Sequence, residues 1–257
     1  MFINMDYQKE GMCFKSLKEV FLDDLVQSFK DKRIIAVTVI YLIFLSWGMK
    51  KAVLLTGIWN IWLTDILGFG QELPFPIIFF YFASIVLLPI FSLLLSYDII
   101  SGESRTMRNL VYRIPRESIF FGKFLAIFLI NIFANLIVYI IAIDFISHTQ
   151  RANIIQQGFL LYGFLVIFAL YFTSLVLLAS TLTNNSKKSL FMGACFIIIP
   201  LLFMLSNTLK IISPFNYYKY GLRFFTESIS YTPFFILIIS SIVFIFIAYF
   251  VFKRKDL

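Results

Sequence analysis

Histidine and cysteine are scarce in this sequence, and their scarcity excludes several kinds of site. There is one histidine, His148, and there are two cysteines, Cys13 in a polar segment and Cys195 within an apolar run. A metal or haem site with two histidine ligands from one chain is therefore excluded, and a disulfide between cysteines in such different surroundings is not expected. We expect no catalytic, metal-binding or cofactor-binding residues in this chain.

Charge is also scarce, and hydrophobic residues take its place. Charged residues make up 14% and hydrophobic residues 60% of the 257 residues, and the mean hydropathy is +0.90. A soluble protein of this length could not bury so much apolar surface. We predict an all-α polytopic membrane protein with a single transmembrane domain, 1–257, in contact with membrane lipids. Its six predicted spans are residues 34–49, 76–97, 119–143, 158–182, 190–209 and 234–252. The first is the shortest, because Lys50 and Lys51 end it early, and their side chains can extend to the membrane interface.

Sequence motifs for ATP binding and for hydrolase activity are missing as well. No G-x-x-x-x-G-K-[ST] occurs, which excludes ATP binding by a P-loop, and neither H-E-x-x-H nor G-x-S-x-G occurs. The predicted spans contain no Asp, Glu, Arg or His. Carriers driven by ions or protons usually need an ionisable group or a broken helix in mid-membrane. The chain therefore shows no energy source of its own.

The net charge of +8 comes from Lys and Arg residues that flank the predicted spans, where they determine the membrane topology. If both termini are cytoplasmic, 16 of the 22 Lys and Arg residues fall in cytoplasmic segments, as the positive-inside rule requires. We predict a multi-pass protein of the cytoplasmic membrane in this orientation. No nucleic-acid partner is expected, because no basic face with interleaved aromatic residues lies outside the spans. We expect no cleaved signal peptide, because residues 1–33 are charged throughout.

Residues 1–33 are predicted to form a cytoplasmic interfacial segment. Apolar side chains recur at steps of three and four through residues 14–30, which is typical of an amphipathic helix. They are Phe14, Leu17, Phe21, Leu25 and Phe29. We expect this helix to lie flat in the membrane interface; the alternative is a soluble helix packed on a partner.

Residues 206–233, before the last span, are expected to form short broken helices in the outer leaflet, or else a plain external loop.

The third predicted span carries two polar but uncharged residues, Asn131 and Asn135. They are four residues apart and so lie on one face of a helix. We expect them to hydrogen-bond across a helix interface. A contact with a transported substrate on the pathway is the alternative.

The most charged stretch between the first and last spans is 98–123. Apolar residues at i, i+3, i+4 and i+7 within 107–114 predict a short amphipathic helix. Ser101 suits an N-cap, Glu103 would stabilise the first turn, and Pro115 would end the helix. The alternative is an arginine-rich interfacial helix that only fixes the topology.

These residues resemble a known family. Asp98-x-x-Ser101-Gly102-Glu103, a basic amphipathic helix, Pro115-Arg116 and then Gly122-Lys123 look like the membrane subunits of type-2 ABC exporters. The likeness extends to the N-terminal interfacial helix, the six spans and Pro89 in the second span. The family's glycine-threonine pair after the glutamate is reduced here to Thr106.

The resemblance implies a permease subunit that is not an enzyme and is driven by two ABC ATPase subunits, which bind ATP and magnesium. It implies a second permease chain, identical or similar, and transport by alternating access or by extrusion from a cleft between the two chains. The helix after the second span would be the coupling helix that docks into the ATPase. The ATPase-coupling residues would be Ser101, Gly102, Glu103, Arg105, Met107, Arg108, Leu110, Val111, Ile114, Pro115 and Arg116.

The apolar spans favour a hydrophobic or amphipathic substrate. Two rival functions remain at this point: a self-powered carrier or channel, and a membrane scaffold or maturation factor that transports nothing. Co-purification with an ATPase would separate the exporter from the carrier. Substrate-stimulated ATP hydrolysis would separate it from the scaffold.

Overall fold

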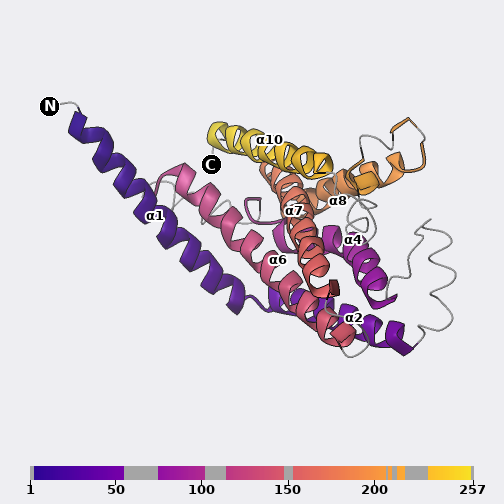
Figure 1. Ribbon diagram of the computed structural model, residues 1–257. Helices are drawn as coiled ribbons and strands as arrows, with labels where there is room; N and C mark the ends of the chain where they lie inside the picture. The colour runs from indigo at the N-terminus through magenta and orange to yellow at the C-terminus, as the bar shows by residue number, and fades with distance from the viewer. Residues whose placement is uncertain are drawn as a thin grey trace.

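The computed structural model describes residues 3–54, 75–101, 114–147, 153–206, 208–209, 213–217 and 231–255, and all of its regular structure in these ranges is helical (Figure 1). The predicted all-α class is confirmed. The α-helices are α1 (Ile3–Lys30), α2 (Lys32–Leu54), α4 (Phe75–Ser96), α6 (Arg116–Ser147), α7 (Asn153–Leu182), α8 (Ser186–Phe203) and α10 (Thr232–Arg254), and η2 (Pro214–Tyr217) is a 3-10 helix.

Each of the six predicted spans overlaps one helix, in the order α2, α4, α6, α7, α8 and α10. Within the described residues, α6, α7, α8 and α10 are long and apolar enough to cross a membrane. Among the residues whose side chains the structure describes, α4 contributes a further apolar helical stretch, Ala83–Ser96. The structure therefore supports a multi-pass membrane protein, and the number of six spans stays a prediction.

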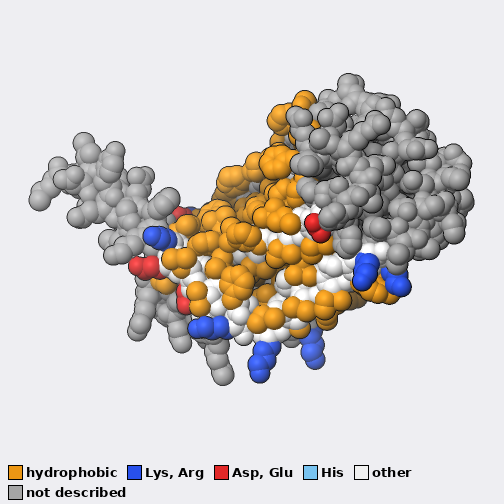
Figure 2. Space-filling model, turned by 60° about the horizontal axis from the view of Figure 1, so that its bottom comes forward, with side chains coloured by type: hydrophobic (Ala, Val, Ile, Leu, Met, Phe, Trp, Pro, Cys, Tyr) orange, Lys and Arg blue, Asp and Glu red, His pale blue; other side chains and the backbone are white. Residues whose placement is uncertain are grey.

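Helix α7 stands at the centre of the bundle. It packs against α4, α6, α8 and α10 (Figure 1). The aromatic rings of Phe164, Phe168 and Phe172 are fully buried along one side of it and contact one another. One face of the bundle presents a broad surface of hydrophobic side chains with Lys and Arg at its margins (Figure 2). Such a surface suits contact with lipid, where apolar residues need not be buried in protein.

Helix α1 differs from the predicted amphipathic helix in its length and in its buried face. It begins at Ile3 and packs along α6 (Figure 1). Within residues 17–30, whose side chains the structure describes, Val20 and Ser28 are buried, whereas Phe29, expected on the apolar face, is 62% exposed. The cause is Gly122 of α6: a Cβ there would lie 2.8 Å from Cγ1 of Val20. This close approach turns Val20 towards α6 and Phe29 away from it. The interfacial position of α1 stays a prediction.

Helix α8 ends earlier than the predicted span 190–209. Its last residue is Phe203, and the next three amides bond to carbonyls three residues back, at 3.0–3.2 Å. Such tight bonds are a common way for a helix to end. The hydroxyl of Ser213 then donates to the carbonyl of Pro200 at 2.6 Å, which holds η2 against α8. This short helical piece lies within residues 206–233, where broken helices were expected.

Candidate functional site

The charged stretch 98–123 is described at its two ends. Of the predicted ATPase-coupling residues, the structure places Ser101, Ile114, Pro115 and Arg116. Outside the described residues lie Gly102, Glu103, Arg105, Met107, Arg108, Leu110 and Val111. We call residues 97–101, which follow α4, the first anchor, and residues 114–117, which lead into α6, the second anchor.

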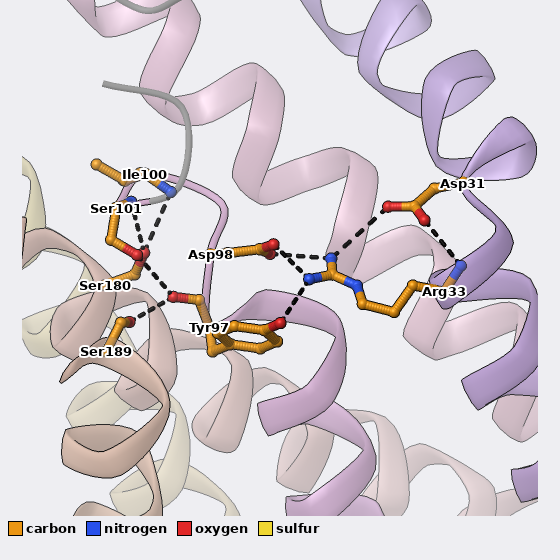
Figure 3. A network of polar contacts seen from close by, with 8 residues as sticks. All are labelled: Asp31, Arg33, Tyr97, Asp98, Ile100, Ser101, Ser180 and Ser189. Carbon is orange, nitrogen blue, oxygen red and sulfur yellow. Dashed lines mark hydrogen bonds and ion pairs between the residues drawn. The ribbon is translucent and has the colours of Figure 1, made fainter. Parts of the chain in front are cut away.

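The first anchor is bound to the start of α2 (Figure 3). Arg33 forms a two-pronged ion pair with Asp98, with Nη2 at 2.9 Å from Oδ1 and Nη1 bonded to Oδ2. Nη1 also donates to the hydroxyl of Tyr97 at 2.9 Å, and Asp31 lies 3.8 Å from Nη2. Burial lowers the pKa of Arg33, but its hydrogen bond to Asp98 and the charge of that carboxylate outweigh burial and raise the pKa above its ordinary value. This pair fixes the end of α4 to α2.

Two serines bind the same anchor to α7 and α8 (Figure 3). Oγ of Ser180 on α7 accepts from the amides of Ile100 and Ser101 at 3.1 and 3.2 Å. The hydroxyl of Ser189 on α8 donates to the carbonyl of Tyr97, and the hydroxyl of Ser101 donates to the same carbonyl at 3.0 Å. The buried backbone groups of this turn are thus satisfied by side chains of other helices.

The second anchor is bound to the end of α10. Nη1 of Arg116 donates to the carbonyls of Lys253 and Lys255 at 2.7 and 3.1 Å. Glu117 accepts from the hydroxyl of Tyr249 at 2.6 Å. Carbonyls at a helix C-terminus lack partners within the helix and carry its negative dipole end, so a guanidinium is well placed there. Ile114 packs against the core, while Pro115 is exposed.

Lys255 connects the end of α10 to the end of α7. Its ammonium donates to the carbonyls of Thr181 and Thr183 at 3.2 and 2.6 Å. Burial lowers the pKa of this lysine. Both anchors therefore reach the last turn of α7, the first through Ser180 and the second through α10.

Asn131 and Asn135 lie fully buried in a hydrogen-bond network between four helices. Nδ2 of Asn131 donates to Oγ of Ser92 on α4 at 2.6 Å and to Oγ1 of Thr173 on α7 at 3.3 Å. Asn135 donates to Oδ1 of Asn131 at 2.8 Å and accepts from the hydroxyl of Tyr41 on α2 at 2.8 Å. In this conformation the two amides join helices to one another.

An ion pair between α1 and α6 was not foreseen from the sequence. Nζ of Lys123 lies 3.1 Å from Oδ1 of Asp24, and the side chains are only 7% and 17% exposed. A lysine inside an otherwise apolar run requires a partner, and this is the signal that could have suggested the pair.

Beside the pair of Lys123 and Asp24 lies a cavity of about 310 Å³ whose charged lining residues are Asp24, Asp31, Arg33, Asp98 and Lys123. Among the described residues no group of His, Cys, Asp and Glu could hold a metal ion.

A second, larger cavity of about 500 Å³ lies between α4, α8 and η2. It includes Pro89 of α4, Leu201 of α8 and Phe215 of η2, and its other lining side chains are also apolar. Several of them are half exposed, among them Val86 at 58% and Ile198 at 50%. This groove can hold only an apolar occupant without leaving polar groups unpaired.

The comparisons with known proteins agree with this arrangement. No curated protein matches the chain. The family model described as "ABC-2 family transporter protein" matches residues 19–257, which include α2 to α10 and both anchors. The resemblance to type-2 ABC exporter permeases is thereby confirmed, and a partner ATPase is implied in general. The chain belongs to the ABC-2 transporter family, as a multi-pass membrane permease.

Proposed function

We propose that this chain is the permease subunit of an ATP-driven exporter and that a separate ABC ATPase supplies the energy. The observation that carries the proposal is the way the charged stretch 98–123 is held. The stretch begins directly after α4 and ends within the first turns of α6, and both of its anchors are hydrogen-bonded to other helices of the bundle. A segment held in this manner can receive force from a partner and pass it to the spans.

The coupling helix of this proposal is the predicted amphipathic helix between the two anchors. Its apolar residues Met107, Leu110, Val111 and Ile114 would insert into the ATPase, with Glu103 at the rim of the contact. Two ATPase subunits with bound ATP and magnesium would close together and draw two such helices with them. The permease itself would hydrolyse no ATP.

The groove between α4 and α8 supports a second permease chain and an apolar pathway beside it. Its wall consists of apolar side chains, of which Val86, Ile90, Ile198 and Leu201 are about half exposed. We propose that a second copy, or a similar chain, faces this groove, and that a hydrophobic or amphipathic substrate moves between the two chains. The single transmembrane domain of 1–257 would be half of this transporter.

The grouping of the anchors supports an orientation of the chain in the membrane. The start of α2, both anchors, the start of α8 and the end of α10 are bonded to one another, so they lie at one end of the bundle. Two of the predicted segments rich in Lys and Arg adjoin this end: the stretch between the two anchors, and residues 183–189 at the start of α8. We therefore propose that it faces the cytoplasm, together with both termini.

The test is ATPase association. Affinity-tagged wild-type chain, purified from its native membrane, is expected to carry an ABC ATPase and to hydrolyse ATP. Leu110→Asp should abolish association, because truncating or charging a central interface anchor costs about 2 kcal/mol or more. Glu103→Arg should weaken it, with a marked dependence on salt concentration. Lys187→Gln, an exposed residue at the start of α8, is the control and should change neither quantity.

Two results would contradict the proposal. If the wild type carries no ATPase, the chain is a self-powered carrier or a scaffold. If Leu110→Asp and Glu103→Arg both retain wild-type association and ATP turnover, the stretch only anchors the topology.

A further inference from the structure

We propose that Arg116 is a positioning residue of the transport cycle: it fastens the second anchor to the end of α10, so that movement of the coupling helix is passed to α10 and α7. The inference rests on the proposed function. It assigns to Arg116 a role inside the permease, whereas family resemblance alone suggested a contact with the ATPase.

The first step of the argument is the position of Arg116. It is the first residue of α6 and follows the predicted coupling helix directly after Pro115. Its guanidinium reaches two carbonyls at the end of α10, although Lys253 is 137 residues away in the sequence. Because these bonds go to the backbone, they hold the helix itself and not a mobile side chain.

The second step is the packing next to these bonds. Phe120 lies 5.7 Å, between ring centroids, from both Tyr249 and Phe252, and Phe121 lies 5.6 Å from Tyr249. Aromatic pairs at this separation stabilise a contact beyond the area that they bury. The first turns of α6 and the last turns of α10 are therefore one unit. We name this unit, residues 116–121 with 249–255, the α6–α10 junction.

The third step is the connection to α7. Lys255 of the junction donates to Thr181 and Thr183, one turn from the hydroxyl of Ser180 that holds the first anchor. A displacement of the coupling helix that changes the separation of the two anchors must therefore break these bonds or move α10 relative to α7. A planar guanidinium with several donors can hold two carbonyls in a fixed geometry, whereas the ammonium of a lysine is a single point charge on a flexible chain.

The first experiment uses the chain alone in lipid nanodiscs. Amide hydrogen exchange in the last turn of α10 is measured for the wild type and for Arg116→Gln. We expect exchange to accelerate at least tenfold in the variant, because the last turn of α10 loses the bonds that hold its end to α6, so it frays and its amides open more often. Arg254→Gln removes an exposed cation from the same turn and should leave exchange unchanged. Unchanged exchange in Arg116→Gln overturns the proposal, whatever partner the chain has.

The second experiment tests transmission in the complex with the ATPase. Spin labels are placed at Ile35 on α2 and Phe250 on α10, both more than 40% exposed, in a chain without its two native cysteines. In the wild type, ATP, magnesium and vanadate should shift the distance between the labels. In Arg116→Gln the shift should fall by at least half, while ATPase binding stays at the wild-type level. Arg116→Lys should restore part of it.

The outcomes separate the two proposals. A full shift in Arg116→Gln, or no shift in the wild-type complex, overturns the role of Arg116. Loss of ATPase association in the wild type would instead contradict the proposed function, and the exchange measurement would still decide whether Arg116 holds α10.

Discussion

Helices α7 and α10 have similar composition and opposite surroundings. Their mean hydropathies over the spanning window are 2.3 and 2.9, yet 78% of that window is buried in α7 and 17% in α10. The more hydrophobic helix is thus the more exposed one. In a bilayer the lipid chains are as apolar as the side chains, so hydrophobicity does not decide which helix lies inside.

The difference between the two helices lies in their small polar residues and in their packing. Thr173, Ser174 and Ser180 of α7 are fully buried, and each takes part in a hydrogen bond. On α10 Leu237 and Phe252 are buried, but many of the other large side chains point outward, as Phe246 does with 56% exposure. Helices that associate in membranes rely on close packing and hydrogen bonds, and α7 has both.

The largest effect should come from truncating matched phenylalanines on the two helices. Phe168→Ala on α7 removes a fully buried ring that contacts Phe164, Phe172 and Phe215. We expect a loss of about 3 kcal/mol in the free energy of unfolding, because a cavity remains. Phe246→Ala on α10 should cost less than about 0.5 kcal/mol. Unfolding in mixed detergent micelles, followed by circular dichroism, measures both values; equal losses would show that α10 is buried in the folded chain.

A smaller effect is expected from substituting two glycines, one in a tight contact between helices and one at an open surface. A Cβ at Gly193 of α8 would lie 2.5 Å from Cδ1 of Leu93, whereas a Cβ at Gly163 of α7 would meet nothing within 4 Å. Gly193→Leu should therefore destabilise the protein by about 1–3 kcal/mol through overpacking. Gly163→Leu is the matched control and should be neutral or slightly stabilising. If both variants unfold at the wild-type detergent fraction, the contact of α8 with α4 is not tight.

The smallest effect of the three concerns the buried network. Asn131→Leu removes donors to Ser92 and Thr173 and should cost about 1 kcal/mol, the usual scale for such bonds in membranes. Ser240→Ala on α10 removes an exposed hydroxyl that bonds only to the carbonyl of Ile236 in its own helix, at 2.7 Å. That change should be within about 0.3 kcal/mol of the wild type. A larger loss for Ser240→Ala than for Asn131→Leu would reverse the comparison.

Sequence patterns predicted some of these features and missed others for identifiable reasons. The spacing of Asn131 and Asn135 indicates a shared face, but not that Ser92 and Thr173 complete the network. The apolar spacing in α1 predicted a helix and misplaced Phe29, because Gly122 on another helix determines how α1 is rotated. The coupling residues between the anchors remain a prediction, since they lie outside the described residues.

Composition and length alone determined the helical class and the position of the apolar segments, because a bilayer requires long apolar runs whose backbone groups bond within the segment. The charged stretch and its flanking residues were enough to suggest the transporter family. Only the tertiary structure decided which helix is central and which charges meet. Arg33 and Asp98 are 65 residues apart, and Arg116 and Lys253 are 137 apart. Periodicity describes one helix at a time, whereas such pairs depend on which helices pack side by side.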